Sequence, residues 1–178
     1  MKENFYQIAI KNGQLPNLLL RDALLPEILG NDNQILYWAG KALARKFPLF
    51  NFADIPIFFA QAGWGDLRLY KANKNRKIYQ LSGANVKTRL EENKEAEFLL
   101  EAGFLSESIQ TIEGYITETE ISEVNLKKHV VTLSVQSDHS EILDFELDSQ
   151  LNFLELIPEH NIASSELKTT GTATVENE

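Results

Sequence analysis

The chain has 178 residues, of which 43% are hydrophobic, so it can bury the core of one globular domain. Its 26 acidic residues outnumber its 17 basic ones, and the net charge of −9 disfavours binding to nucleic acid or anionic membranes. It has no cysteine, which rules out disulfides and a catalytic thiol. No apolar run is long enough to span a membrane, and the first residues lack the apolar stretch of a signal peptide. We therefore expect a cytoplasmic protein.

The first third of the chain has helical spacing. Residues 15–30, LPNLLLRDALLPEILG, predict a helix with a break near Pro26 and an end at Gly30. Residues 33–47 predict a second helix, capped by Asp32 or Asn33. Its apolar residues recur at helical spacing: Ile35, Ala39, Ala42, Leu43 and Phe47. A short third helix is expected over residues 54–62.

The period changes to that of β-strands at residue 66. The runs 66–70, DLRLY, and 77–81, KIYQL, flank a polar tip and predict a hairpin. The segment 84–90, ANVKTRL, fits either a helix or a strand, and we favour a helix.

The longest predicted helix, within residues 95–113, is followed by a second hairpin. One stripe contains Phe98, Ala102, Leu105, Ile109 and Ile112, and Gly114 is the expected stop. Residues 115–122 and 129–138 predict the two strands, with Val131, Leu133 and Val135 on one face. The order ααα-ββ-α-ββ predicts an α+β domain, with helices packed on a four-stranded antiparallel sheet.

The character of the chain changes after Asp138. We place a single domain at residues 1–138, with its core at 15–138. Residues 139–157 form an appended segment whose leucines fit helical spacing slightly better than strand spacing. Residues 158–178 are rich in threonine and poor in large apolar groups, which predicts a disordered tail.

Few residues have the spacing of catalytic or metal sites. The histidines, His129, His139 and His160, do not have metal-site spacing, and we expect surface residues rather than ligands. The carboxylates fit solvated faces better than an acid–base pair, which sequence alone cannot place. An enzyme using carboxylates with Tyr37 or Tyr115 ranks last among our hypotheses. We expect no catalytic residue, no metal and no cofactor.

The run AGWG at residues 62–65 marks a corner between a helix and a strand. It lacks the lysine and hydroxyl of a phosphate loop and precedes a strand instead of a helix, so phosphate binding is disfavoured. We predict Gly63 as the left-handed end of the helix, Trp64 as the aromatic that docks the corner, and Gly65 as a close-approach residue.

Two glycines lie inside predicted helices. Gly40 and Gly103 each cost about 1 kcal/mol relative to alanine, so a compensating reason is expected. Close packing between elements is the first explanation, and a void kept open for a ligand is the second. If the neighbouring aromatic residues converge, they form an apolar groove of the kind that binds small molecules.

Three runs in this order resemble a known pattern: 35–49 (ILYWAGKALARKFPL), 58–67 (FFAQAGWGDL) and 98–110 (FLLEAGFLSESIQ). Together they resemble the YslB-like family of uncharacterised bacterial proteins, over about residues 15–138. That family is related in fold to TRAPP vesicle-tethering subunits and to the 4-vinyl-reductase domain.

The resemblance implies a channel between helices and sheet for an apolar small molecule or acyl chain, or pairing through the N-terminal helices. Carried onto this chain, the groove residues are Tyr37, Trp38, Gly40, Phe59, Gly63, Trp64, Gly65, Gly103 and Phe104. Some relatives carry a cysteine cluster or an acylated cysteine. This chain has neither, which disfavours a metal or thioester mechanism.

Two hypotheses lead. The first is a non-enzymatic binding module that holds an apolar small molecule, an acyl chain or a protein partner between helices and sheet. The alternative is a homodimeric scaffold with a filled core, because the first two helices have more apolar surface than one stripe needs. A cavity beside Trp64 favours the first hypothesis, and a packed core favours the second.

Overall fold

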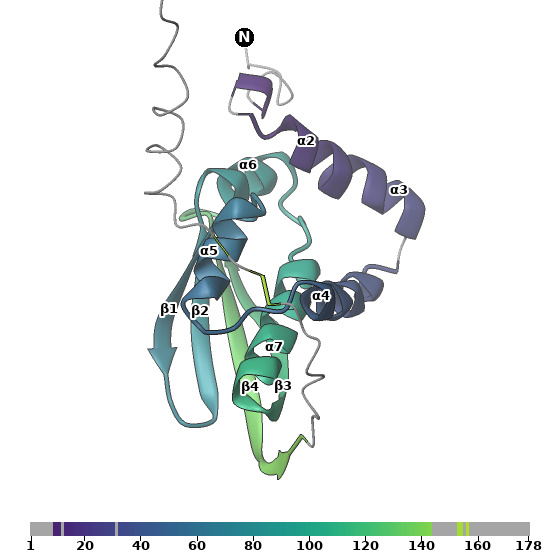
Figure 1. Ribbon diagram of the computed structural model, residues 1–178. Helices are drawn as coiled ribbons and strands as arrows, with labels where there is room; N and C mark the ends of the chain where they lie inside the picture. The colour runs from purple at the N-terminus through teal and green to yellow at the C-terminus, as the bar shows by residue number, and fades with distance from the viewer. Residues whose placement is uncertain (1–8, 12, 31, 144–152, 155, 157–178) are drawn as a thin grey trace, which may run out of the picture.

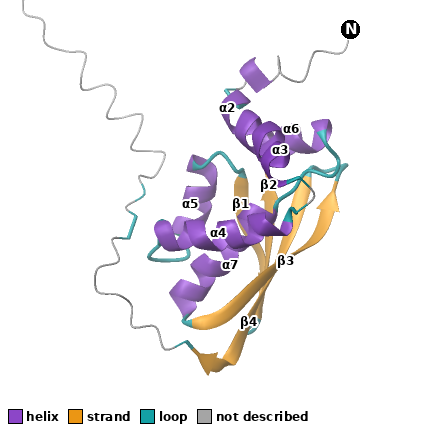
Figure 2. Cartoon of the chain, turned by 90° about the vertical axis from the view of Figure 1, so that its right-hand side faces the viewer, coloured by secondary structure: helices purple, strands orange, loops and turns teal. Residues whose placement is uncertain are grey.

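The protein is a two-layer α+β structure with helices on one face of an antiparallel sheet. The computed structural model describes residues 9–11, 13–30, 32–143, 153, 154 and 156. The four strands lie in the order β1-β2-β4-β3, each antiparallel to its neighbours. Helices α5 and α7 cover one face of the sheet, and no helix among the described residues covers the other, here called the open face (Figures 1 and 2). The predicted fold class is confirmed.

The first helix is continuous, and the predicted break at Pro26 is wrong. Its parts are α2 (Leu15–Leu18), the π-helical turn η1 (Leu19–Leu24) and α3 (Leu25–Leu29). The backbone N–H of Leu25 donates to the carbonyl of Leu20, five residues back. A proline has no N–H and crowds the preceding turn of an α-helix, so we attribute the wider π turn to Pro26. Gly30, with φ of 59°, ends the helix as predicted.

Helices α4 (Gln34–Lys46) and α5 (Asp54–Gln61) follow. The apolar spacing of α4 predicted the wrong face, because Ile35, Ala39 and Ala42 are exposed. Its buried residues are Leu36, Gly40, Lys41 and Ala44. Asn33 precedes α4 but makes no side-chain capping bond. The face that α4 buries is set by its packing against α7 and β3, as shown below.

Both predicted hairpins are present. The first joins β1 (Asp66–Ala72) to β2 (Arg76–Ser82), and the second joins β3 (Tyr115–Asn125) to β4 (Val130–Ile142). Val131, Leu133 and Val135 alternate along β4 and are all fully buried. They form the sheet side of the hydrophobic core.

Two helices lie between the hairpins, α6 (Ala84–Glu92) and α7 (Leu99–Glu113). The ambiguous segment at 84–90 is therefore helical, as favoured. Every residue of α7 from Glu101 to Gln110 is buried, so this helix is enclosed on all sides. Gly114, in the left-handed conformation with φ of 75°, ends it as predicted.

The region beyond residue 138 differs from the helix that we expected. Residues 139–142 extend strand β4, so a helix there is wrong. Leu154 and Leu156 pack against the core from outside the regular elements. The rest of the appended segment and the predicted disordered tail at 158–178 lie outside the described residues. The division of the chain at residue 138 stays a prediction.

A buried cluster of four charged side chains attaches the first helix to the body of the protein. Arg21 Nη2 lies 2.9 Å from Glu101 Oε2, and Arg89 Nη1 lies 3.3 Å from Glu101 Oε1. Arg89 Nε also lies 2.9 Å from a carboxylate oxygen of Asp22. Glu101 has no exposed surface, and Arg21 and Arg89 are each 7% exposed. The cluster therefore joins η1 to α6 and α7.

The two arginines determine the ionisation of Glu101. Burial alone would raise the pKa of Glu101, but Arg21 and Arg89 outweigh it and lower the pKa below its ordinary value. The Glu101 carboxylate in turn raises the pKa of Arg21 despite the opposing effect of burial. The cluster is thus an ionised network, and removing one partner leaves a charge buried without compensation.

We predict that Glu101→Gln lowers the free energy of unfolding by about 3 kcal/mol, because two arginines lose their central carboxylate. Glu91→Gln is the matched control. The Glu91 side chain is 51% exposed and makes only long ion pairs, so its loss should cost less than about 1 kcal/mol. Urea denaturation followed by circular dichroism measures both variants.

The same variants test how the free energy of unfolding depends on pH. A carboxylate with a lowered pKa stabilises the fold above its unfolded pKa of about 4.3, and this contribution is lost as pH falls through the lower folded pKa. The difference between wild type and Glu101→Gln should therefore shrink below pH 4. A difference that is small at pH 7, or that does not change on acidification, would contradict the role assigned to Glu101.

Candidate functional site

Four aromatic rings fill the space between α5, the following corner and α7. Trp64 lies 5.2 Å from both Phe59 and Phe104, and 5.6 Å from Phe58, between ring centroids. The rings of Phe58 and Phe104 stack at 4.2 Å with an interplanar angle of 9°. Phe59 and Phe104 are fully buried, and Trp64 is 8% exposed. Edge-to-face and stacked contacts of this kind are typical of a packed aromatic core.

The corner beside Trp64 has the geometry predicted for its two glycines. Gly63 has φ of 70°, and its carbonyl oxygen accepts hydrogen bonds from Asn17 at 2.7 Å and Asn85 at 2.6 Å. Gly65 has φ of 125°, and a Cβ there would lie 2.5 Å from the carbonyl oxygen of Ser82. The predicted roles of Gly63 and Gly65 are confirmed, and the two asparagines anchor the corner to α2 and α6.

The two helix glycines face each other where α4 crosses α7. A Cβ on Gly103 would lie 1.9 Å from the carbonyl oxygen of Tyr37. A Cβ on Gly40 would lie 2.2 Å from the carbonyl oxygen of Leu100. The two backbones are therefore in direct contact, and any side chain at either position would force them apart. Of the two explanations for these glycines, close helix packing is confirmed.

The crossing places Tyr37 and Lys41 against the outer edge of strand β3. The hydroxyl oxygen of Tyr37 accepts a hydrogen bond from the backbone N–H of Thr119 at 3.1 Å. Lys41 Nζ donates to the carbonyl oxygen of Thr117 at 3.3 Å and contacts Glu118 at 2.8 Å. These side chains satisfy backbone groups that an edge strand otherwise leaves free for pairing with another chain.

The environment of Tyr37 keeps its hydroxyl protonated. Burial raises the pKa of Tyr37 to about 12, and its hydrogen bond to the Glu118 carboxylate adds to the shift. A phenol with this pKa is a poor general base at neutral pH. Its contacts are those of a structural hydrogen-bond donor and acceptor.

Trp38 does not join the other predicted groove residues. Its side chain is 64% exposed, and its ring touches the edge of the Tyr37 ring at 5.8 Å on the outside of α4. Phe59, Trp64 and Phe104 form the aromatic cluster, with Gly63 and Gly65 beside it. Tyr37, Gly40 and Gly103 lie at the helix crossing next to Phe104. Binding of an apolar molecule by these residues stays a prediction.

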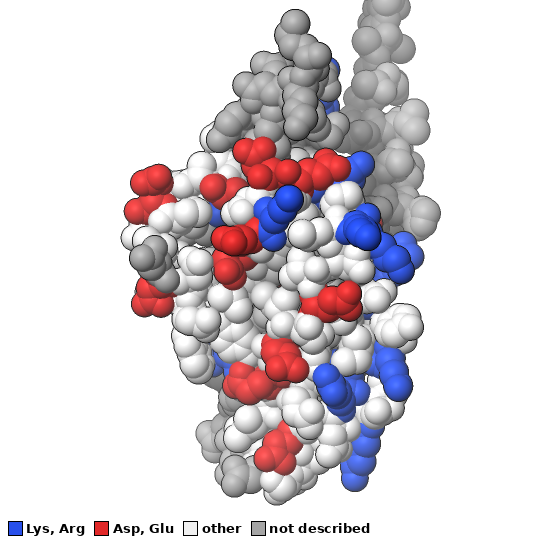
Figure 3. Space-filling view, turned by 180° about the vertical axis from the view of Figure 1, so that it is seen from behind, with Lys and Arg blue, Asp and Glu red and all other residues white. Residues whose placement is uncertain are grey.

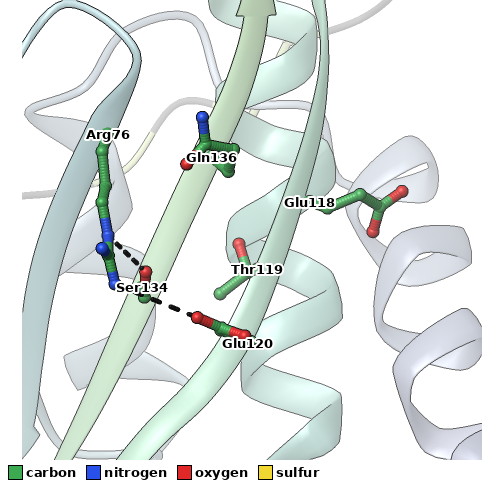
Figure 4. Close-up of a pocket in the computed structure, with 6 residues that line it drawn as sticks. All are labelled: Arg76, Glu118, Thr119, Glu120, Ser134 and Gln136. Atoms are coloured by element: carbon green, nitrogen blue, oxygen red, sulfur yellow. Dashed lines mark hydrogen bonds and ion pairs between the residues drawn. The ribbon is translucent and has the colours of Figure 1, made fainter.

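A shallow hollow of about 320 Å³ lies on the open face of the sheet. Its lining residues are Arg76, Glu118, Thr119, Glu120, Ser134 and Gln136. Arg76 Nε donates to Ser134 Oγ at 2.9 Å, and the Arg76 guanidinium lies 4.0 Å from Glu120. Figure 4 shows Glu118 turned away from the other five side chains. Within the hollow, Arg76 is therefore held by Ser134 and Glu120.

Charged side chains are unevenly distributed over the face that carries this hollow. Figure 3 shows most of the lysine and arginine along one margin, with a further basic group among the acidic side chains that lie over much of the remainder. A second pocket, of about 200 Å³, adjoins the buried charge cluster and includes Arg21, Arg89 and Leu36 in its lining. Both arginines there are already bound to carboxylates.

Within the described part of the chain, no three His, Asp or Glu side chains are grouped as metal ligands would be.

The first helix presents an exposed apolar surface, here called the leucine face. Its members are Leu19, Leu20, Leu24 and Ile28, which are 48%, 51%, 51% and 66% exposed. Beside them lies a shallow hollow of about 560 Å³ lined by residues of this helix, of which only Glu27 is charged. Large apolar side chains grouped in this way mark an interaction surface more often than a solvated helix. The excess of apolar residues in the sequence indicated such a surface, but it did not identify its members.

Comparison with known proteins identifies the family of this chain. The model of the family described as "Protein of unknown function (DUF2507)" matches residues 14–136. The chain belongs to the DUF2507 family. It is also 42% identical over 121 residues to the uncharacterized protein YslB of Bacillus subtilis (strain 168), covering 67% of this chain and 81% of YslB. The predicted family resemblance is confirmed.

Two solved structures are similar to this DUF2507 protein. A vinyl-4-reductase family protein from Methanocaldococcus jannaschii has a TM-score of 0.54 and 17% identity, covering 78% of this chain and 98% of that protein. A trafficking protein particle complex subunit 3 from Naegleria fowleri, covalently bound to palmitic acid, has a TM-score of 0.39 and 14% identity over 82% and 100% of the two chains. The first likeness supports the fold alone.

The DUF2507 match contains the leucine face, the aromatic corner and the helix crossing. It ends before Phe153, Leu154 and Leu156, which nevertheless contact the domain. No helix among the described residues of this DUF2507 protein is long and apolar enough to cross a lipid bilayer.

We predict that Gly103→Ala destabilises the protein by at least about 2 kcal/mol, because the new methyl group meets the backbone of α4. At an unconstrained helix position the same change would stabilise by about 1 kcal/mol, so the sign of the effect is diagnostic. Ser108→Ala on the same helix is the control, since the buried Ser108 hydroxyl has no hydrogen-bond partner. Thermal and urea unfolding measure both variants, and a stabilising Gly103→Ala would contradict the close crossing.

Proposed function

We propose that this protein is a non-enzymatic interaction module that forms a homodimer through the leucine face of its first helix. The observation that carries this proposal is the exposure of Leu19, Leu20, Leu24 and Ile28 together on one helix. Burying such a surface against a second copy would remove apolar area from water at about 25 cal/mol per Å².

A second copy suits this surface better than a charged partner. The chain carries a net charge of −9, so two copies repel each other wherever their acidic surfaces meet. The hollow beside the leucine face is lined by five uncharged residues and Glu27, so repulsion is small there. A two-fold axis through the face would bring the same leucines of both copies together in an isologous contact.

The attachment of the first helix also supports an interaction role. Arg21 and Asp22 face inward to Glu101 and Arg89, so the charged residues of η1 are used inside the protein. The apolar residues of the same turn are left outside. The π turn thus holds the leucine face outward on a helix that is anchored by buried ion pairs.

Packing of the aromatic corner bears on the alternative proposal of an apolar small molecule or acyl chain. Trp64 contacts three phenylalanine rings where the groove was expected. This packing favours a partner on the surface over a ligand in the interior.

We expect sedimentation equilibrium of the wild-type chain at micromolar concentration to give twice the monomer mass. Leu24→Asp should weaken dimerisation by about 100-fold, because each copy then buries an unpaired carboxylate. Leu126→Asp is the control, since Leu126 is 41% exposed in the turn between β3 and β4. A wild-type monomer, or equal effects of the two substitutions, would overturn the proposal.

A further inference from the structure

A short segment near the C-terminal end of the described residues contacts the connection between α4 and α5. The backbone N–H of Leu154 donates to the carbonyl oxygen of Pro48 at 3.0 Å. The ring of Phe153 meets the edge of the Phe50 ring, with centroids 5.4 Å apart and an interplanar angle of 84°. Figure 1 shows this stretch in yellow-green between α4 and α5.

The contact reaches the hydrophobic core. Leu154 and Leu156 are partly buried and pack against the core cluster, which includes the fully enclosed Leu49. Residues two apart share one face of an extended chain, so this spacing fits a peptide with both leucines directed inward. A backbone hydrogen bond together with side chains in apolar contacts is the usual way that an extended peptide is recognised.

The sequence around the docked residues is acidic. Residues 144–159 contain five acidic side chains and no basic one. The last turn of α4, immediately before the contact, carries the exposed Lys46 and Arg45, whose guanidinium is already bound to Glu107 at 2.6 Å. An acidic peptide approaching Pro48 would therefore be attracted by Lys46.

We propose that the surface around Pro48, Leu49 and Phe50 is a binding site for a short extended peptide of the pattern Phe-Leu-x-Leu with acidic flanks. Phe153, Leu154 and Leu156 of this chain are its resident occupant. The site lies within the family match at residues 14–136, and the occupant lies beyond it. The site is separate from the leucine face and does not depend on dimerisation.

The resident segment competes with any added peptide. Tethering gives it an effective concentration of the order of millimolar, so a free peptide of micromolar affinity binds the intact chain weakly. Releasing the segment removes this competition. The site is therefore expected to be detectable only when Leu154 and Leu156 no longer dock.

The test is fluorescence anisotropy with a labelled peptide of residues 150–159, QLNFLELIPE. The full-length double variant Leu154→Asp/Leu156→Asp should bind it at least about tenfold more tightly than wild type does. The same peptide with both leucines changed to aspartate should not bind. Circular dichroism confirms that the double variant is folded.

A matched pair of substitutions in that double variant locates the site. Phe50→Ala should weaken peptide binding severalfold, because Phe50 is 70% exposed and meets Phe153. Phe52→Ala should leave it unchanged, since Phe52 lies beside Lys77 instead. The proposal is overturned if the double variant binds the peptide no better than wild type, or if Phe50→Ala and Phe52→Ala act alike.

Discussion

The direct contact between the backbones of α4 and α7 is the constraint on which the arrangement of this protein depends. Gly40 and Gly103 remove the side chains that would separate the two helices. With α4 so close, Tyr37 and Lys41 reach the outer strand β3 and bond its free backbone groups. One crossing therefore packs the helical layer and covers an edge of the sheet. The cost of two glycines in helices is offset by these contacts.

Because of this packing, the candidates for binding lie on the surface and not in the interior. Trp64 and three phenylalanine rings occupy the place where a groove was expected, and α7 is enclosed along most of its length. Apolar side chains accumulate outside, on the leucine face and at Phe50. These two surfaces thus become the candidates for binding. The first faces a second copy in our proposal, and the other already holds a peptide segment.

Features fixed by local chemistry could be predicted from the sequence. Strand alternation identified both hairpins. The left-handed conformations of Gly63 and Gly114 could be predicted because glycine adopts them more readily than other residues do. The face of α4 could not be predicted, because its neighbours α7 and β3 decide which residues are buried. The ion pair of Arg21 with Glu101 joins positions 80 residues apart, and no local pattern records it. We expected Trp38 in the groove because it follows Tyr37 in the sequence, but that position does not determine how exposed its side chain is.

We expect binding to take place on the surface of this protein and not inside its core. Native mass spectrometry of the purified full-length protein, followed by analysis of an organic extract, tests it most directly. We expect the mass of two bare chains and an extract without a stoichiometric apolar compound. A single chain that carries an apolar molecule, released on extraction, would contradict it.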